Sequence, residues 1–372
     1  MKSQVDAPGD APAQPGAPKP TSWLRKHRGK LAISLICGAG FVWVLNAGAL
    51  PILPSQEAFA GVKWWAFAAY LGLWFVVHWI RAVRWQWLLS PIAEVSRRRV
   101  VDVSFIGFLA IVMLPLRTGE VVRPVMIRRK GELSGWAATG TIAAERVIDG
   151  LVLTLMLWVA LLVSEPLDPL PNKIAELPIP AAVVPTATYA ALVLFGGAFV
   201  AMGLFFAKRQ LARQLVAWAF AWISPRLANW LSERVEKVAS GLAFLPRARE
   251  SAWFVGATIA YWLRNAAAGW VLAWGAGLSE MTFWHSAVVT GVLALGILLP
   301  NAPGFFGAFQ VSVYAALAIF FQPDVVTGAG SAYVFLLYVG QLLVTILAAA
   351  WALAREHTSL SDALNSEATS LD

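Results

Sequence analysis

Charged residues are scarce in this sequence. Only 13% of its 372 residues are Asp, Glu, Lys or Arg, and 59% are hydrophobic. Soluble domains contain roughly 25% charged residues, about twice this share. An apolar excess of this size, which includes 19 Trp and 20 Phe, is more than one soluble core can bury. The composition therefore excludes an ordinary soluble protein and predicts a polytopic membrane protein.

Cysteine and histidine are also rare. The single cysteine, Cys37, lies in an apolar run, which excludes a disulfide within one chain and a metal site built from cysteines. The four histidines are isolated, and none forms H-E-x-x-H or another metal-binding spacing. The sequence also has no P-loop and no G-x-S-x-G element. We therefore expect no metal, no cofactor, no catalytic motif and no ATP-driven transport by this chain alone.

Nine apolar segments follow one another along the chain, and a membrane helix needs about 20 predominantly apolar residues. Six approach that length: Leu31–Leu50, Trp64–Ile80, Trp136–Val163, Ala181–Ala207, Trp253–Gly275 and Gly330–Ala354. Three are too short or too broken for full spans: Val101–Leu116, Thr282–Leu299 and Phe305–Phe321. The pattern predicts an all-α polytopic fold. We interpret Leu31–Leu50 as a retained helix, although a signal peptide cleaved near Ala47-Gly48-Ala49 stays open as an alternative.

The basic residues indicate sidedness. Of the 29 Lys and Arg, 25 lie in residues 1–30, 81–100, 117–136 and 207–252 or after residue 354. Because cytoplasmic loops carry the excess of Lys and Arg, these segments and both termini are predicted to be cytoplasmic, in a bacterial inner membrane. The net charge of +8 therefore reflects topology, and we expect no nucleic-acid partner.

The charges beside the short segments indicate the membrane face from which each segment enters. Basic stretches flank Val101–Leu116 on both sides, so it should enter and leave by the cytoplasmic face. Glu280 and Asp324 flank the pair at 282–321, which should therefore enter from the opposite face. The prediction is about six full transmembrane helices and two re-entrant elements. Irregular backbone at membrane depth is tolerated where it is buried in protein or lines a wet cavity, so we expect a polar cavity.

Two stretches resemble each other. GFLAIVMLPLRTG (Gly107–Gly119) and GVLALGILLPNAPG (Gly291–Gly304) share a G-x-L-A start and an L-P-x-x-x-G end. Short apolar segments interrupted by Pro and Gly in two halves of a chain are typical of the binding site of an inverted-repeat transporter. Chance is the alternative, because Leu, Ala, Gly and Pro are abundant here.

The densest polar cluster is LPLRTGEVVRP, residues 114–124. A proline and Gly119 should break the incoming helix, and Thr118 should cap a new helix whose first turn carries Glu120. Such a helix start, with Arg117 and Arg123 beside it, is suited to a phosphate or another anion. In the alternative, these arginines only anchor the chain at the cytoplasmic interface.

Further charges fall inside the apolar segments. Glu145, Arg146 and Asp149 lie in the segment that opens at Trp136, where charges usually pair or mark a pathway. They should face the bundle interior, in a substrate site or in a structural ion-pair network. Arg264 lies in the middle of Trp253–Gly275 and is also expected to face the interior. Arg81 and Arg84, at the end of another segment beside Trp85, are expected to be interfacial anchors.

The second break, LPNAPGFFGAFQ at residues 299–310, carries no charge. Asn301 and Gln310 offer hydrogen bonds there, and Pro303 and Gly304 should allow a sharp turn with close backbone approach. This break is expected to complete the cavity, with a purely structural broken helix as the alternative.

Outside the apolar segments, the chain is expected to have three peripheral parts. Residues 1–22 are rich in Ala, Pro and Gly and predict a disordered cytoplasmic tail. Within the transmembrane domain at 23–355, residues 208–250 carry apolar residues at helical spacing between Lys and Arg, which predicts amphipathic helices on the cytoplasmic leaflet. Residues 356–372 form a polar C-terminal tail.

The ordered set RAVRWQWLL (81–89), LPLRTGEVVRP, AAERVIDG (143–150) and LPNAPGFFGAFQ resembles the lysylphosphatidylglycerol synthase transmembrane-region family, also called the flippase-like family. The resemblance covers residues from about 30 to 355. It implies an inner-membrane protein of lipid translocation or export, similar to the flippase half of the multiple peptide resistance factor and to proteins of hopanoid, glycolipid or polyprenyl-lipid handling. The family motifs coincide here with Arg117, Gly119, Glu120, Arg123, Glu145, Arg146, Asp149, Pro303 and Gly304.

Two departures limit what the resemblance implies. The sequence contains no soluble aminoacyl-transfer domain, so lysyl transfer is not expected. Gln310 stands where the family often carries Glu, so we expect no ion-coupling carboxylate at that position. The predicted function is transport of an anionic phospholipid, glycolipid or polyprenyl-phosphate lipid. The alternatives are a membrane enzyme acting on lipid head groups and a scaffold subunit of a lipid-modifying complex. A homo-oligomer or a lipid-modifying enzyme partner stays open.

Overall fold

The computed structural model describes residues 23–128, 132–178, 180–222, 224–298 and 302–356. Within these residues it contains helices and no β-strand. Six helices have 20 or more residues, and they coincide with the six predicted spans: α1 (Trp23–Ala47), α3 (Trp64–Val83), α7 (Gly135–Val163), α8 (Val183–Ala207), α11 (Ala248–Gly275) and α15 (Ala329–Glu356).

Among the residues that the structure describes, four helical segments are both long and apolar enough to cross a membrane: Trp64–Leu89, Gly135–Val163, Val183–Ala207 and Pro323–Glu356. The first joins α3 to the short α4 (Trp85–Leu89), and the last joins α14 (Pro323–Thr327) to α15. Helix α1 has a shorter apolar part, Ala32–Ala47, and α11 is 28 residues long. The predicted all-α polytopic membrane fold is therefore confirmed.

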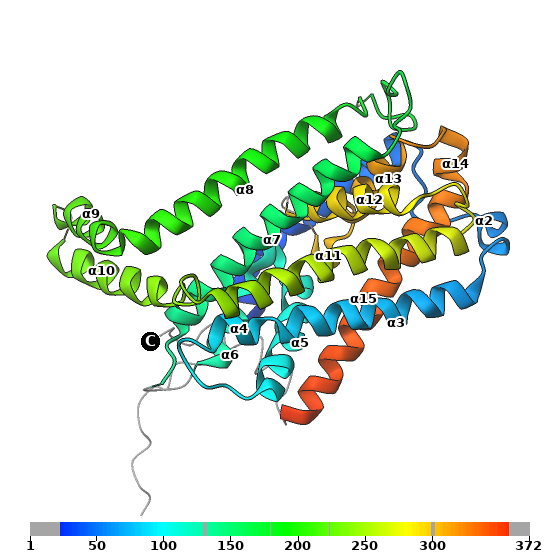
Figure 1. Ribbon diagram of the computed structural model, residues 1–372. Coiled ribbons are helices and arrows are strands. Elements are labelled where there is room, and N and C mark those ends of the chain that lie inside the picture. The colour runs from blue at the N-terminus through cyan, green and yellow to red at the C-terminus, as the bar shows by residue number, and fades with distance from the viewer. Residues whose placement is uncertain (1–22, 129–131, 179, 223, 299–301, 357–372) are drawn as a thin grey trace, which may run out of the picture.

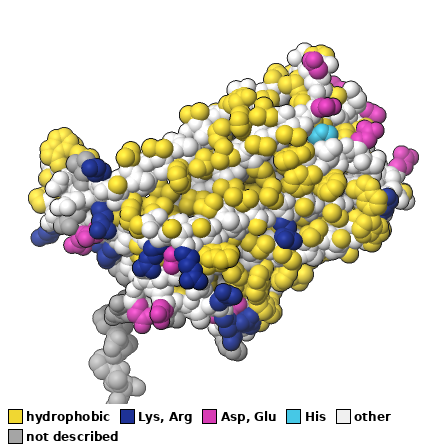
Figure 2. All heavy atoms as spheres, in the orientation of Figure 1, with side chains coloured by type: hydrophobic (Ala, Val, Ile, Leu, Met, Phe, Trp, Pro, Cys, Tyr) yellow, Lys and Arg dark blue, Asp and Glu magenta, His cyan; other side chains and the backbone are white. Residues whose placement is uncertain are grey.

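Figure 1 shows α3, α7, α8 and α11 running side by side between the two ends of the molecule. Helices α9 (Arg209–Ala221) and α10 (Pro225–Ser240) lie at one end, and α2 (Gln56–Ala60) and α14 lie at the other. Residues 208–250, where amphipathic helices were expected, thus contain α9 and α10. In Figure 2, most of the visible Lys and Arg side chains lie toward the end with α9 and α10, where some acidic side chains lie among them, and the charged side chains visible at the opposite end are mainly acidic.

The predicted short segment at 101–116 belongs to a helical hairpin, which we call the first hairpin. It consists of α5 (Arg97–Met113), the 3-10 helix η1 (Pro115–Val121) and α6 (Val122–Ile127). The chain turns at Leu114, which is extended (φ −85°, ψ 137°) because it precedes a proline. The two arms begin and end side by side, since Arg99 Nη2 donates to the carbonyl oxygen of Met126 at 2.8 Å.

A glycine brings the arms of the first hairpin together near its tip. A Cβ atom on Gly119 would lie 2.2 Å from the carbonyl carbon of Ala110, so only glycine fits between η1 and α5. Thr118 lies inside η1 and does not cap an α-helix, because the 3-10 helix that starts at Pro115 continues directly into α6. The predicted helix start at Thr118 was wrong, and α6 is only six residues long.

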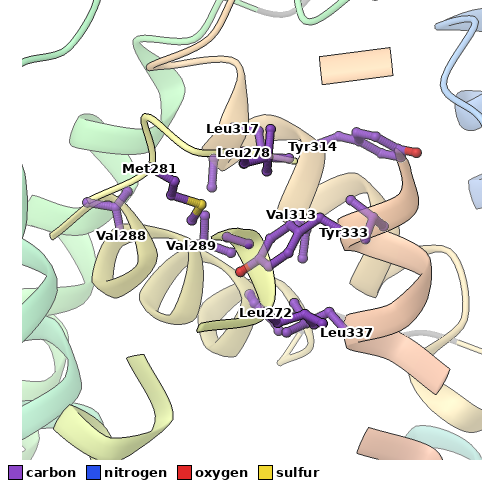
Figure 3. Packing of buried hydrophobic residues seen from close by; sticks show 14 of the residues in the cluster. Leu272, Leu278, Met281, Val288, Val289, Val313, Tyr314, Leu317, Tyr333 and Leu337 are labelled. Carbon is purple, nitrogen blue, oxygen red and sulfur yellow. The ribbon is translucent and has the colours of Figure 1, made fainter. Parts of the chain in front are cut away.

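The second hairpin consists of α12 (Phe283–Gly296), the one-turn 3-10 helix η2 (Pro303–Phe305) and α13 (Ala308–Leu317). Its open end is marked by the rings of His285 and Phe320, which stack with centroids 4.2 Å apart. Gly304 and Gly307 adopt φ values of 77° and 85°, which glycine reaches without the cost that a side chain would add. Figure 3 shows how this hairpin packs: Val288, Val289, Val313 and Leu317 meet side chains from α11 and α15.

The two hairpins open at opposite ends of α15. Arg99, at the open end of the first hairpin, forms an ion pair with Glu356 at the last residue of α15. Leu317, at the open end of the second, lies within 3.3 Å of a Cβ built on Gly330, at the start of α15. A helix rises about 1.5 Å per residue, so the 28 residues of α15 separate these open ends by about 42 Å. The hairpin tips therefore point toward each other.

Candidate functional site

The tips of the two hairpins meet at Arg117. Its Nη1 donates to the carbonyl oxygen of Ile297 at 3.2 Å, and its guanidinium lies 5.7 Å from the ring centroid of Phe305. Nη2 donates to Glu120 Oε1 at 2.9 Å. Arg117 has a φ of 57°, a left-handed conformation that residues other than glycine rarely adopt. Such strain persists where the surrounding structure imposes it, often at functional sites.

A cavity of about 310 Å³ lies at this junction. Charged side chains from α3, η1 and α7 line one part of it, and aromatic and aliphatic side chains line the rest. The charged residues are Arg81, Arg117, Glu120, Arg146 and Asp149. The rest of the lining includes Trp74, Phe108, Tyr261, Trp262, Phe309 and Tyr338. The predicted polar cavity between the two broken elements is therefore present.

Arg81 differs from the other arginines of the cavity. Among the described residues, its guanidinium has neither a hydrogen-bond acceptor nor a carboxylate partner. It lies instead over the ring of Phe108, 4.2 Å from the centroid, and its Nε is buried without an acceptor. A buried guanidinium that makes no direct ion pair or hydrogen bond can still donate to a ligand, so Arg81 favours the entry of an anion.

Behind the cavity lies a buried ion-pair network centred on Glu145, whose side chain is fully buried. Its carboxylate accepts from Arg84 Nη2 at 3.3 Å and from Arg123 Nη1 at 3.2 Å, and it also pairs with Arg146. Asp149 accepts from both terminal nitrogens of Arg84, with 2.6 Å between Nη2 and Oδ2. The network connects α7 to α3, α4 and α6, because Arg84 joins α3 to α4 and Arg123 lies in α6.

The cavity and the network together carry a positive surplus. Five guanidiniums, those of Arg81, Arg84, Arg117, Arg123 and Arg146, face three carboxylates, those of Glu120, Glu145 and Asp149. Arginine stays protonated in proteins, so this cluster carries two more positive than negative charges. The arrangement is suited to binding an anion from the cavity side.

The predicted site residues divide into groups. Arg117, Glu120, Arg146, Asp149 and Gly304 line the cavity as expected. Arg123 and Glu145 are fully buried behind the cavity and do not line it. Gly119 contributes to the site by allowing the two arms of the first hairpin to pack closely against each other.

Arg264, Pro303 and Gln310 were also predicted for the site, and they are not among the residues that line the cavity. Arg264 was expected to face the interior, but it is exposed on α11, where the neighbouring Asn265 lines the cavity instead. Consecutive residues of a helix point about 100° apart, so Asn265 can face the cavity while Arg264 faces outward. Gln310 Oε1 accepts from the backbone N–H of Gly307 at 2.7 Å and so caps α13. Pro303 lines a neighbouring groove, and Asn301 lies outside the described residues.

Sequence reasoning missed Arg81 and Arg84, which it assigned to interfacial anchoring. Arg84 is fully buried, and Arg81 lines the cavity. A signal for both was available. A span of about 20 residues counted from Trp64 reaches Val83, so both arginines fall within or directly beside the span. The two carboxylates of α7 also require cations from other helices.

The family model described as lysylphosphatidylglycerol synthase TM region matches residues 29–347. This match contains both hairpins and the whole charged cluster. No curated protein and no solved structure matches the chain.

Proposed function

This chain belongs to the lysylphosphatidylglycerol synthase transmembrane-region family, a family related to lipid handling, and on that premise we propose that it is a lipid transporter. In this proposal the cavity binds the anionic head group of a membrane lipid and allows it to cross the membrane. The observation that carries the proposal is Arg81, a cation without a direct hydrogen-bond or ion-pair partner among the described residues, in a cavity whose charged cluster has a positive surplus.

The chemistry of the cavity favours a phosphate-bearing head group. The guanidiniums of Arg81, Arg117 and Arg146 line the same cavity, and the planar fork of arginine matches the oxygen atoms of phosphate. Aromatic and aliphatic side chains form most of the remaining lining, and such a low-dielectric surround strengthens contacts between charges. The class of ligand is therefore an anionic phospholipid, glycolipid or polyprenyl phosphate.

The carboxylates of the cavity favour binding over head-group chemistry. Glu120 pairs with Arg117, and Asp149 holds both terminal nitrogens of Arg84. A general base must reach the proton that it removes, whereas these carboxylates already accept from arginines. We therefore place the membrane-enzyme alternative second.

The proposal also includes the orientation of the two hairpins in the membrane. We propose that both are re-entrant, with the open end of the first at the cytoplasmic face of the inner membrane and the open end of the second at the other face. The basic residues around α5, α9 and α10 support this orientation, and it places both termini in the cytoplasm. The hairpin tips then meet within the bilayer, where irregular backbone is buried in protein.

Cysteine labelling tests this topology. In a Cys37→Ser background, cysteines placed at Glu94 and Glu132, on either side of the first hairpin, should react with an impermeant maleimide from the same face. A cysteine at Glu280 should react from the opposite face. All three positions are exposed, so labelling measures sidedness and not burial. Reaction of positions 94 and 132 from opposite faces would show that the first hairpin spans the membrane.

Removal of the Arg81 charge tests the transport proposal. Losing a charge-assisted hydrogen bond costs roughly 1.5–3 kcal/mol, so Arg81→Gln should slow transfer of fluorescent anionic lipids in proteoliposomes by about ten- to a hundredfold. Arg264→Gln is the matched control, because it removes the same charge from an exposed position on α11 and should transfer lipid at the wild-type rate. Equal rates for Arg81→Gln and wild type, or no transfer by folded wild-type protein, would refute the proposal.

A further inference from the structure

A groove adjoins the cavity on the side where α5 and α15 approach the turn of the second hairpin. We call it the lateral groove, and it has a volume of about 230 Å³. Its lining includes Val112, Met113, Pro303, Gly304, Leu342 and Ile346. Met113 and Ile346 are about half exposed, at 48% and 47%, so the groove reaches the outer surface of the helices.

The lateral groove offers little for a polar ligand to bind. Its one hydroxyl among the described lining residues belongs to Thr345, and that hydroxyl donates to the carbonyl oxygen of Gln341 at 2.7 Å. Thr345 Oγ1 also lies 3.1 Å from His78 Nε2. The groove is therefore apolar in effect, and a hydrocarbon chain is the ligand class that it favours.

The lateral groove is continuous with the charged cavity. Val112, Gly304, Leu342 and Thr345 line both. Gly304 precedes Phe305, and the ring centroid of Phe305 lies 5.7 Å from the guanidinium of Arg117. The groove therefore begins close to a cation of the cavity. On the other side, Thr345 contacts His78, which lies three residues before Arg81 on α3. A ligand bound at these arginines thus has an apolar exit beside it.

The size of the cavity explains why such an exit is required. At about 310 Å³ it lies at the lower end of the roughly 300–1,000 Å³ that small-molecule sites occupy. That volume suits a head group and is too small to enclose the hydrocarbon chains of the same lipid. The chains must lie outside the cavity while the head group is bound.

We propose that a hydrocarbon chain of the bound lipid leaves the cavity through the lateral groove, between α5 and α15, and stays in the bilayer during transport. This inference rests on the proposed function, because it assigns the second part of the same ligand. It defines the substrate class as a lipid with a small anionic head group, and it makes the face between α5 and α15 the entrance for lipid.

The test uses the full chain in detergent and two probes, dipalmitoyl phosphatidylglycerol and the water-soluble glycerol phosphate. Ile346→Trp should fill the groove and weaken phosphatidylglycerol binding by about tenfold or more, the effect of losing burial of about two methylene groups. Ile346 lines the groove and is not a lining residue of the cavity, so the affinity of this variant for glycerol phosphate should stay at the wild-type value. Leu347→Trp is the matched control, because Leu347 is the neighbouring residue and is 59% exposed; this variant should bind both probes normally.

A second measurement keeps the inference testable if Ile346→Trp does not fold. A phosphatidylglycerol with a photoreactive group in its chain should crosslink wild-type protein at Met113 or Ile346. Crosslinks at Phe195 on α8, another lining residue of the cavity, would instead place the exit on that side and overturn the inference. Normal phosphatidylglycerol binding by Ile346→Trp would overturn it as well. If the wild type binds neither probe, the proposed function itself fails.

Discussion

Glu145→Gln is expected to lower the free energy of unfolding by about 3–5 kcal/mol, the usual cost of removing one partner from a buried ion pair. The carboxylate of Glu145 is the one that pairs with the fully buried Arg123, with 3.0 Å between Oε2 and Nη2. Arg84 and Arg146 keep Asp149 as a partner, so Arg123 bears most of the loss. Glutamine has the same shape as glutamate, and the change therefore isolates charge from packing.

Denaturant unfolding in mixed micelles measures this effect. The double variant Glu145→Gln, Arg123→Met should recover much of the lost stability, because replacing both partners of a buried ion pair by neutral groups is often close to neutral. Glu280→Gln, at an exposed loop position, should change stability by less than about 0.5 kcal/mol. If Glu145→Gln unfolds like the wild type, Glu145 is not the counter-charge of Arg123.

The positions of the long helices could be predicted closely from the sequence. The apolar segments Trp136–Val163 and Gly330–Ala354 differ from α7 and α15 by at most two residues at either end. This agreement has a physical cause, since an apolar run long enough to span the bilayer is a local property of the chain. The hairpins were also predictable, because basic residues on both sides of α5 require both flanks to lie at one end.

The direction in which a membrane helix faces could not be predicted in the same way. In water, an apolar stripe marks the buried face of a helix, but lipid tails are as apolar as a protein core, so this signal is lost. Arg264 illustrates the consequence, because α11 is apolar around most of its surface and its buried face is set by packing against α3 and α12. The sequence placed the charge inside the span and could not show that it faces outward.

Ion-pair partners that come from distant parts of the chain could not be predicted from the sequence either. A structural ion-pair network was one of the two expectations for Glu145, Arg146 and Asp149, but nothing indicated that Arg84 and Arg123 would be partners in it. Arg84 and Asp149 are 65 positions apart, and nothing in the local pattern of either segment indicates that their helices meet. The charge content of the site could thus be predicted, but the separation into a buried network and a cavity lining required the fold.

Gly119→Ala is expected to have the largest effect on the site, because it acts on the element that carries both Arg117 and Glu120. A Cβ atom at this position would lie 2.2 Å from the carbonyl carbon of Ala110 and 2.4 Å from the backbone nitrogen of Ile111. Both are backbone atoms of α5 and cannot rotate away, so η1 must move. Overpacking costs about 1–3 kcal/mol where side chains adjust, and we expect about 3 kcal/mol or more here.

Displacement of η1 should also abolish function. Arg117 reaches the carbonyl oxygen of Ile297 from η1, so a shift of η1 separates the two hairpin tips and opens the cavity. Binding of glycerol phosphate and transfer of fluorescent lipid should both be lost in Gly119→Ala protein that still elutes as a folded species. Gly72→Ala on α3 is the matched control: a Cβ at Gly72 meets nothing within 4 Å, and alanine stabilises a helix interior by about 0.5–1 kcal/mol. Wild-type stability and transfer in Gly119→Ala would mean that η1 does not pack against α5.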